Sequence, residues 1–272
     1  MRTRPLPLVL TYAAAAVVLV VYLAPLALIL LNSVKTSDEA STFSFALPEN
    51  WMFSNYTTVL NDPGISRALV NSVIIAAGVT VGTIFICSFA AYIIARRTDW
   101  FSRGVYAYLL VGLIAPFSVI PAIRVLQLLG LGNTHLGIIL VDIASQIPFT
   151  TLLLVGFIRQ IPRELDEAAL IDGAGRFTIF LRIIFPLMRP VTLTVLVLVV
   201  TFAWNEFQNV LFLAGSDVWT LPMTIFNFQS LHSFDYALVS ANLVVTALPM
   251  VVVFLVAQRY IMSGIMSGAV KS

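Results

Sequence analysis

Three charged side chains in otherwise apolar stretches are the residues of this chain most suited to chemistry. Arg124, Asp142 and Glu206 each lie among apolar residues. A charge near the centre of a bilayer costs about 2.5–3.5 kcal/mol on insertion scales, and opposite charges at one depth relieve each other's desolvation. All three lie at a similar distance from one end of their stretches, so we predict that Arg124 forms an ion pair with Asp142 or Glu206.

Amides and hydroxyls recur at helical spacing in the same stretches. They form three groups, one in each of the last three apolar stretches. In chain order these are Asp142, Ser145, Gln146 and Thr150, then Thr201, Asn205, Gln208 and Asn209, and a weaker group of Asn242 and Thr246. Polar helix faces in lipid turn inward, where they either line a path for a hydrophilic solute or bond to neighbouring helices, at about 0.6 kcal/mol per bond. Both interpretations stay open. The candidates for a solute path are Asp142, Gln146, Thr201, Asn205, Gln208, Asn209 and Asn242.

Other kinds of site have no support in the sequence. Lys35 and Lys271 are the only lysines, and neither follows a glycine-rich loop, so the chain lacks a P-loop for ATP. Cys87 is the only cysteine, His135 and His232 are isolated, and no nucleophile and base form a recognisable pair. We therefore predict no catalytic residue, no metal or cofactor bound by this chain, and no nucleic-acid partner.

The elements that must position these residues are membrane helices. Of the 272 residues, 60% are hydrophobic and only 10% are charged, too few charges to coat a soluble globule. No charge occurs from Leu8 to Leu31, a stretch longer than the roughly 7–15 apolar residues of a signal peptide, which favours an uncleaved first span. We predict an all-α membrane protein with one transmembrane domain over residues 1–272. Its six spans lie near 8–31, 68–95, 105–129, 137–158, 190–213 and 236–258.

The basic residues are distributed unequally between the two sides, and this sets the orientation. If the N-terminus is cytoplasmic, twelve of the 15 Lys and Arg fall on the inner side, Lys35 and Arg67 fall on the outer side, and Arg124 lies within a span. The inner group is Arg2, Arg4, Arg96, Arg97, Arg103, Arg159, Arg163, Arg176, Arg182, Arg189, Arg259 and Lys271. We therefore predict that both termini are cytoplasmic, with a large outer loop at 32–67 and a large inner loop at 159–189.

Prolines and glycines predict where the helices bend and touch. Pro116, Pro121 and Pro148 remove helix hydrogen bonds in the third and fourth spans and permit bends there. Gly78 and Gly82 form a small-xxx-small pair in the second span, which favours close helix packing.

The inner loop has the signals of a short helix. Pro162 suits a first helical turn, the carboxylates of Glu164, Asp166 and Glu167 lie near the positive helix end, and Gly173 suits the C-terminal stop. A helix of about eleven residues is hardly stable alone and requires a partner surface. A second amphipathic segment follows, after which prolines turn the chain into the fifth span. Its shared apolar face is Phe177, Phe180, Leu181 and Ile184, and the prolines are Pro186 and Pro190.

On periodicity alone, this loop is equally consistent with an ordinary interfacial helix whose basic residues lie near lipid headgroups. The order of its residues, however, resembles that of a known family. Glu167-Ala168-Ala169, Gly173 and Ile183-Ile184-Phe185-Pro186 match the cytoplasmic loop of permease subunits in binding-protein-dependent ABC importers, with Phe185 where the family usually has Leu. Further motifs resemble the carbohydrate-type, maltose-permease-like members. They are Asn71-Ser72, Ala90-Ala91-Tyr92, Ala95-Arg96, Asn133-Thr134-His135-Leu136-Gly137, Trp204-Asn205-Glu206-Phe207, Gln258-Arg259-Tyr260 and Gly268-Ala269-Val270-Lys271.

The resemblance implies a permease subunit in a prokaryotic inner membrane that forms half of a path for a sugar or related polyhydroxylated solute. It implies that residues 161–174 form a coupling helix that docks on a cytoplasmic ATPase subunit, where Glu167 makes a polar contact. The coupling residues are then Glu167, Ala168, Ala169, Asp172, Gly173 and Pro186. The expected partners are a second homologous permease, two copies of the ATPase subunit that use ATP and Mg²⁺, an extracytoplasmic solute-binding protein and the lipid bilayer.

Two other functions remain open at this point. A permease of this kind can serve a solute other than a sugar. An ion-gradient-driven carrier, in contrast, would couple through Asp142 and Glu206 and would need no ATPase. Two carboxylates near one end form a poor ion relay, and no inverted repeat is evident.

Overall fold

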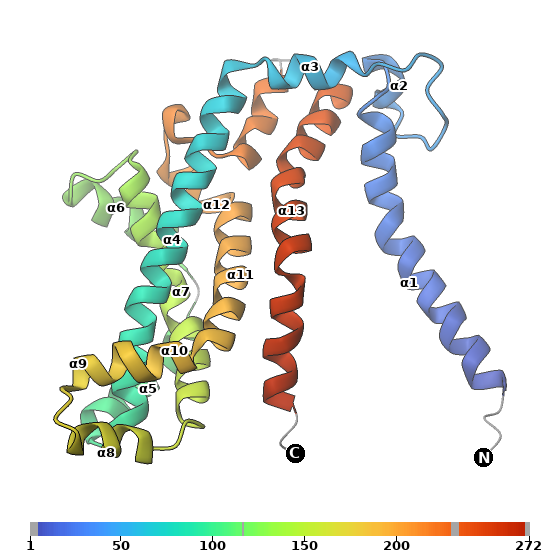
Figure 1. The fold of residues 1–272 in the computed structure, drawn as a ribbon. Coiled ribbons are helices and arrows are strands. Elements are labelled where there is room, and N and C mark those ends of the chain that lie inside the picture. The colour runs from blue at the N-terminus through green and yellow to red at the C-terminus, as the bar shows by residue number, and fades with distance from the viewer. Residues whose placement is uncertain (1–4, 116, 230–233, 270–272) are drawn as a thin grey trace. The chain divides into compact units, whose positions relative to one another are not determined.

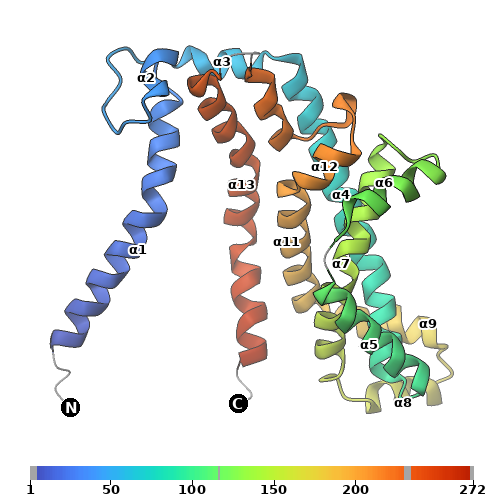
Figure 2. The same ribbon diagram turned by 180° about the vertical axis from the view of Figure 1, so that it is seen from behind.

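The computed structural model describes residues 5–115, 117–229 and 234–269, and most of them are helical (Figures 1 and 2). Within these ranges there is no β-strand, only an isolated antiparallel bridge between Gln229 and Phe234. The predicted all-α class is therefore confirmed. Arg2, Arg4, Lys271, Pro116 and His232, which entered the sequence analysis, lie outside the described residues.

The helices fall into long elements and short connecting elements. The long ones are α1 (Pro5–Asn32), α4 (Pro63–Arg96), α5 (Trp100–Ile114), α7 (His135–Ile158), α11 (Arg189–Asn205) and α13 (Tyr236–Ala269). The short ones are α2 (Ser37–Ser41), α3 (Ser54–Leu60), α6 (Val119–Leu128), α8 (Glu164–Ile171), α9 (Arg176–Ile179), α10 (Phe185–Leu187) and α12 (Gln208–Leu213), with a π-helical turn at Phe180–Ile184 and 3₁₀ turns at Ser216–Val218 and Leu221–Phe228. Among the described residues, four helices are long and apolar enough to cross a membrane, namely α1, α4, α7 and α13. The number reaches the predicted six only if two bent pairs of helices each count as one span.

The predicted third span, 105–129, is not one helix. Helix α5 ends at Ile114, α6 begins at Val119, and their axes differ by 118°. Ala115 is extended at the end of α5, as expected for a residue that precedes a proline in the sequence. Pro121 lies in the first turn of α6, where its missing N–H removes no helix bond, so it does not bend this helix.

Helix α7 continues through Pro148 from His135 to Ile158 without a break, so the predicted fourth span is one helix. The predicted fifth span, 190–213, does break, although it contains no proline after Pro190. Helix α11 ends at Asn205, Glu206 is extended, and α12 begins at Gln208.

Polar side chains replace backbone hydrogen bonds at this break. Asn205 Nδ2 donates to the carbonyl of Thr201 at 2.8 Å, and Glu206 Oε1 accepts from the backbone N–H of Asn209 at 2.7 Å. Such local side-chain bonds compete with the helix ladder. Gln208 and Asn209 therefore do not continue the helix face of Thr201 and Asn205, and the predicted single stripe of four residues is wrong.

The described chain consists of two compact units, and each is considered by itself. The first comprises 1–67 and 224–249, and the second comprises 68–223 and 250–272. In the first unit, Lys35 is buried and donates from Nζ to the carbonyl of Ser44 at 2.6 Å. Asn55 Nδ2 donates to the carbonyls of Ser33 and Lys35. These bonds give the predicted outer loop a fixed structure around a buried cation.

In the same loop, Glu39 closes the first turn of α2. Its carboxylate accepts from the backbone N–H groups of Glu49, at 3.0 Å, and Thr36, at 3.1 Å. These two donors stabilise the charged form and hold the pKa of Glu39 below its usual range. The turn therefore stays capped at neutral pH.

Helix α7 is the centre of the second unit, where it packs against α5, α11 and α12. Helix α4 approaches α7 closely at two glycines. A Cβ on Gly78 would lie 2.7 Å from Ile139 Cδ1, and a Cβ on Gly82 would collide with Ile143 Cδ1. The packing role predicted for Gly78 and Gly82 is confirmed.

Replacing Gly82 with Leu is expected to push α4 from α7 and to destabilise the folded chain by about 1–3 kcal/mol, the usual cost of overpacking. Gly156→Leu in α7 is the matched control, because a Cβ there has no neighbouring atom within 4 Å. Thermal unfolding of the full chain in lipid nanodiscs measures both variants. Adding Ile143→Ala to Gly82→Leu should recover part of the loss. Equal stability of the two leucine variants would contradict this contact.

Candidate functional site

The predicted short helix of the inner loop is present as α8, with eight residues instead of about eleven. Its first turn carries Glu164, Asp166 and Glu167, and these carboxylates are stabilised by the partial positive charge at the N-terminal end of the helix. It ends where predicted, because Gly173 adopts φ +80° and donates its N–H to Leu170 O at 3.0 Å, and the next N–H reaches Ala169 O at 2.9 Å. This pair of bonds is the Schellman motif, which favours glycine.

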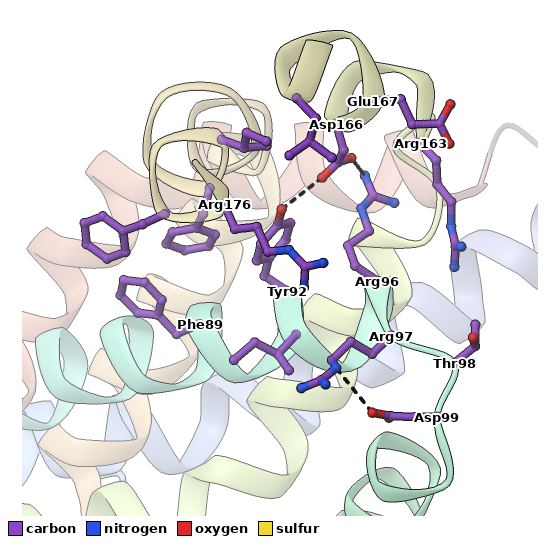
Figure 3. A pocket seen from close by; sticks show the side chains of 15 residues that line it. Phe89, Tyr92, Arg96, Arg97, Thr98, Asp99, Arg163, Asp166, Glu167 and Arg176 are labelled. Carbon is purple, nitrogen blue, oxygen red and sulfur yellow. Dashed lines mark hydrogen bonds and ion pairs between the residues drawn. The ribbon is translucent and has the colours of Figure 1, made fainter. Parts of the chain in front are cut away.

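One acidic residue of α8 attaches the helix to the rest of the unit. Asp166 Oδ2 lies 2.8 Å from Arg96 Nη2, and Asp166 Oδ1 accepts from Tyr92 Oη at 3.0 Å (Figure 3). The side chains of Arg96 and Asp166 are only 12% and 13% exposed. Arg96 Nη1 also donates to the carbonyls of Ile158, at 3.3 Å, and Ile161, at 3.0 Å. A single guanidinium thus joins α8, the end of α4 and the end of α7.

Sequence reasoning did not find this cluster. Tyr92 entered only in a motif of the resemblance, Arg96 in a motif and among the inner basic residues, and Asp166 only as a charge near a helix end. The available signal was weak, since it consisted of an arginine at the end of a span and an acidic residue far along the chain. Only the tertiary structure brings them together.

The other side of α8 is exposed. Glu167, Ala168 and Asp172 face outward, and Ile171 is 87% exposed. Among the described residues, the Glu167 side chain has no hydrogen bond or ion pair. Ala169 points the other way and is buried. The predicted coupling residues therefore divide into an outward acidic and apolar surface and an inward contact.

The segment after α8 packs through aromatic rings. Phe180 is buried, with its ring centroid 4.4 Å from that of Phe89 and 5.3 Å from that of Tyr92. The predicted shared face of this segment is only partly right, because Phe180 and Ile184 are buried whereas Phe177 and Leu181 are exposed. The π-helical turn at 180–184 explains the difference, since its wider turn changes the helical register.

The chain bends by 76° between this segment and α11, which begins at Arg189. Pro186 lies at the start of α10, and Pro190 lies at the start of α11. Both positions tolerate the absence of a backbone donor. The predicted turn into the fifth span is confirmed.

The predicted ion pair of Arg124 is not present among the described residues. Arg124 is exposed and donates to Gln127 Oε1 at 3.3 Å. Asp142 is fully buried and accepts from Asn209 Nδ2 at 2.8 Å, while Glu206 accepts from the Asn209 backbone. The prediction assumed a straight third span, and the bend before α6 changes the course of the segment that carries Arg124.

The candidates for a solute path also divide into two groups. Asp142 and Asn209 bond to each other, and Asn242 bonds to Thr224 Oγ1 at 3.0 Å. These three residues are buried and serve contacts within the chain. The other candidates are at least partly accessible in the single chain. They are Gln146, which is half-buried, and Thr201, Asn205 and Gln208, which are exposed.

Asn71 forms a junction that the sequence did not predict. Its Nδ2 donates to the carbonyls of Asp217 and Trp219, each at 2.9 Å, and its Oδ1 lies 2.8 Å from His135 Nε2. His135 therefore has a structural contact that links α7 to α4. Within the described ranges, no three His, Cys, Asp or Glu side chains are grouped closely enough to hold a metal ion.

A cavity of about 700 Å³ lies beside α8, between the end of α4 and α9 (Figure 3). Its lining includes Arg96 and Asp166. Asp99 also lines it, 3.2 Å from Arg97 Nε. The hydroxyl and backbone N–H of Ser102 hold the pKa of Asp99 below its usual range, so this carboxylate is charged at neutral pH.

Comparison with known proteins identifies both relatives and fold. The family model described as "Binding-protein-dependent transport system inner membrane component" matches residues 84–265. The chain is 35% identical to the melibiose/raffinose/stachyose import permease protein of Bacillus subtilis (strain 168) over 261 residues, 94% of each chain. It is 34% identical to the multiple sugar-binding transport system permease protein of Streptococcus mutans over 93% of each. It is 35% identical to the trehalose/maltose transport system permease protein of Thermococcus litoralis over 80% of each.

Solved structures show the same fold. A chain of a bacterial ABC transporter involved in the import of the acidic polysaccharide alginate superimposes with a TM-score of 0.83 at 20% identity, over 96% of this chain and 98% of that one. A chain of the bacterial alginate transporter in complex with an alginate pentasaccharide-bound periplasmic protein gives a TM-score of 0.68 at 16% identity, over 91% and 92%. At these identities the likeness concerns the fold alone.

A double-mutant cycle on Arg96→Gln and Asp166→Asn should give a coupling of about 1–3 kcal/mol, because the pair is shielded from water and shares one network. Local opening of α8, measured by hydrogen exchange of the full chain in nanodiscs, reports this free energy. The matched control is Arg97→Gln with Asp99→Asn, whose side chains are 55% and 38% exposed, with an expected coupling of about 0–1 kcal/mol. A coupling for the first pair no larger than for the second would contradict the role of Arg96.

Proposed function

The chain belongs to the family of binding-protein-dependent transport system inner membrane components, and from this premise we propose that it is the permease subunit of a sugar ABC importer. Three relatives that match over most of their length are named as permease proteins for melibiose/raffinose/stachyose import, for multiple sugar-binding transport and for trehalose/maltose transport. In this proposal the chain forms half of a path for a sugar or related polyhydroxylated solute. A soluble binding protein delivers the solute, and a second homologous permease supplies the other half.

The outward surface of α8 is the contact for the ATPase subunit. The observation that carries this assignment is an exposed Glu167, without an ion pair among the described residues, on a helix whose other face is bonded to Arg96 and Tyr92. A helix of eight residues attached by backbone alone would fray when pushed. Because Asp166 anchors it, movement of α8 moves the ends of α4 and α7 as well. The nucleotide chemistry, with ATP and Mg²⁺, then belongs to two partner ATPase subunits.

The exposed polar side chains of α11 and α12 are the better candidates for the solute path. Thr201, Asn205 and Gln208 present hydroxyl and amide groups outside the packed interior of the chain. In a membrane such groups require a polar neighbour, either water, solute or another chain. Amides and hydroxyls both donate and accept, as sugar hydroxyls do. Asp142 and Asn209 instead hold the shape of the break between the two helices.

The orientation follows from the distribution of basic residues, which supports six spans, both termini in the cytoplasm and α8 on the inner side. The outer loop at 32–67 then faces the solute-binding protein. Its buried Lys35 supports a loop of defined structure, which is what a docking surface needs. The ion-gradient carrier is set aside, because the family is defined by dependence on a binding protein.

Glu167→Arg should lower sugar-stimulated ATP hydrolysis of the assembled transporter by at least about tenfold, because it reverses a charge at the docking contact. Glu49→Arg is the matched control, since this glutamate is exposed on the outer loop. Co-purification of the ATPase subunit and hydrolysis with binding protein and candidate sugars are both measured. Wild-type coupled uptake by Glu167→Arg would refute the assignment of α8.

The neighbours Gln208 and Asn209 give a second test. Gln208→Leu should lower sugar uptake by about 2- to 10-fold with unchanged stability, as expected for one lost hydrogen bond to the solute. Asn209→Leu should instead destabilise the chain by about 1–3 kcal/mol, because Asp142 loses its buried donor. Transport in vesicles and thermal unfolding separate the two effects. Loss of stability in both variants would favour a purely structural role for these polar side chains.

A further inference from the structure

The lining of the cavity beside α8 has an excess of positive charge. Four arginines line it, together with three carboxylates. Two of the carboxylates are already neutralised, since Asp166 bonds Arg96 and Asp99 bonds Arg97. The remaining residues are Arg163, Arg176 and Glu167. Among the described residues, neither Arg163 nor Arg176 has a hydrogen bond or ion pair through its side chain.

Glu167 does not cancel both of these guanidinium groups. It is a single carboxylate, and in the proposed function it is directed to the ATPase subunit. Arg163 and Arg176 therefore leave the lining with a net positive charge that attracts an anion, and in Figure 3 their side chains lie on either side of Arg96. Guanidinium groups bind phosphate oxygens through charge-assisted hydrogen bonds and are well suited to planar, bidentate contacts with them.

The rest of the lining is largely apolar, and two of its residues, Phe89 and Ile93, belong to a strip along α4. Phe85, Phe89 and Ile93 are spaced by four residues and so share one face of that helix. Phe85 and Ile93 are 63% and 48% exposed. The Phe89 ring stacks on that of Phe177 with centroids 5.8 Å apart and an interplanar angle of 12°. From Ile93 to Phe85 the strip runs about 12 Å along the helix axis.

The positively charged lining and the apolar strip together match a molecule with an anionic head and an apolar tail. A carboxylate from a protein partner would use the arginines and leave the aromatic strip uncovered. A free phosphate would do the same. We propose that this cavity binds an anionic phospholipid of the inner leaflet, whose phosphate contacts Arg163 and Arg176 and whose acyl chain lies along Phe85, Phe89 and Ile93.

The assignment rests on the proposed function in one respect, because it requires α8 to lie on the inner side of the membrane. Basic pockets at that level are suited to anionic lipid headgroups. The bound lipid would connect α4 to α9 beside the Arg96 cluster. It would thereby fill the space next to the helix that meets the ATPase.

The experiment uses the assembled transporter, purified and stripped of lipid, with native mass spectrometry to count bound lipids. Phosphatidylglycerol and phosphatidylcholine of the same acyl chains are titrated separately. Wild type should prefer phosphatidylglycerol, and Arg163→Gln with Arg176→Gln should weaken that binding by roughly tenfold. The matched control, Arg103→Gln with Arg182→Gln, removes two exposed arginines that do not line the cavity and should bind as wild type does.

Two further arms identify the ligand. Arg163→Lys with Arg176→Lys keeps both charges and should retain much of the preference, which guards against a glutamine variant that fails to assemble. Inorganic phosphate and glycerol phosphate should not displace the lipid at millimolar concentration. Displacement by either would overturn the lipid assignment in favour of a soluble phosphate.

Other outcomes also decide the matter. No preference for phosphatidylglycerol in the wild-type complex, with a preference in the chain lacking its ATPase subunits, would show that a protein fills the cavity. Equal loss of binding in the control pair would reduce the effect to general surface charge and overturn the site. Sugar-stimulated ATP hydrolysis is measured on the same samples, so failure of the lipid site with normal stimulation leaves the proposed function intact.

Discussion

The ion pair between Arg96 and Asp166 is the interaction on which the inner end of this chain depends. A helix as short as α8 has too few backbone hydrogen bonds to remain folded by itself, and in the proposed function one face of it stays free for a partner. Its attachment therefore has to come from few residues on the other face. Arg96 meets that need because it also bonds the carbonyls of Ile158 and Ile161, so one side chain joins three segments.

A second buried carboxylate, that of Asp142, is stabilised in a different way. Asp142 is buried where a charged group has a high free-energy cost. Its carboxylate accepts a hydrogen bond from the amide of Asn209 instead of pairing with a cation. The backbone N–H of Asn209 in turn donates to the carboxylate of Glu206. This arrangement requires α11 to stop at Asn205. The shape of the helix thus follows from the bonding needs of two carboxylates, with no proline involved.

Features that depend on residues close together in the sequence could be predicted, whereas features that depend on residues far apart could not. The C-terminal end of α8 was predictable because Gly173 acts within a few residues of the backbone it caps. The start was predicted too early, because Pro162 lies before the first turn and α8 begins at Glu164. Gly78 and Gly82 were predictable because their spacing alone places them on one face. The Arg96 cluster was not, since its members are far apart in sequence. The break at Glu206 and the burial of Lys35 also depend on tertiary partners, which no local pattern contains.

The end of α11 has one more consequence. The last turn of any helix leaves carbonyl oxygens without partners in the helix, and these carry a partial negative charge. In α11 that turn ends at Asn205, whose side chain donates to the carbonyl of Thr201. Main-chain oxygens do not change when side chains are replaced. In the proposed solute path, the end of α11 thereby keeps hydrogen-bond acceptors at a fixed depth while its side chains diverge to suit different solutes.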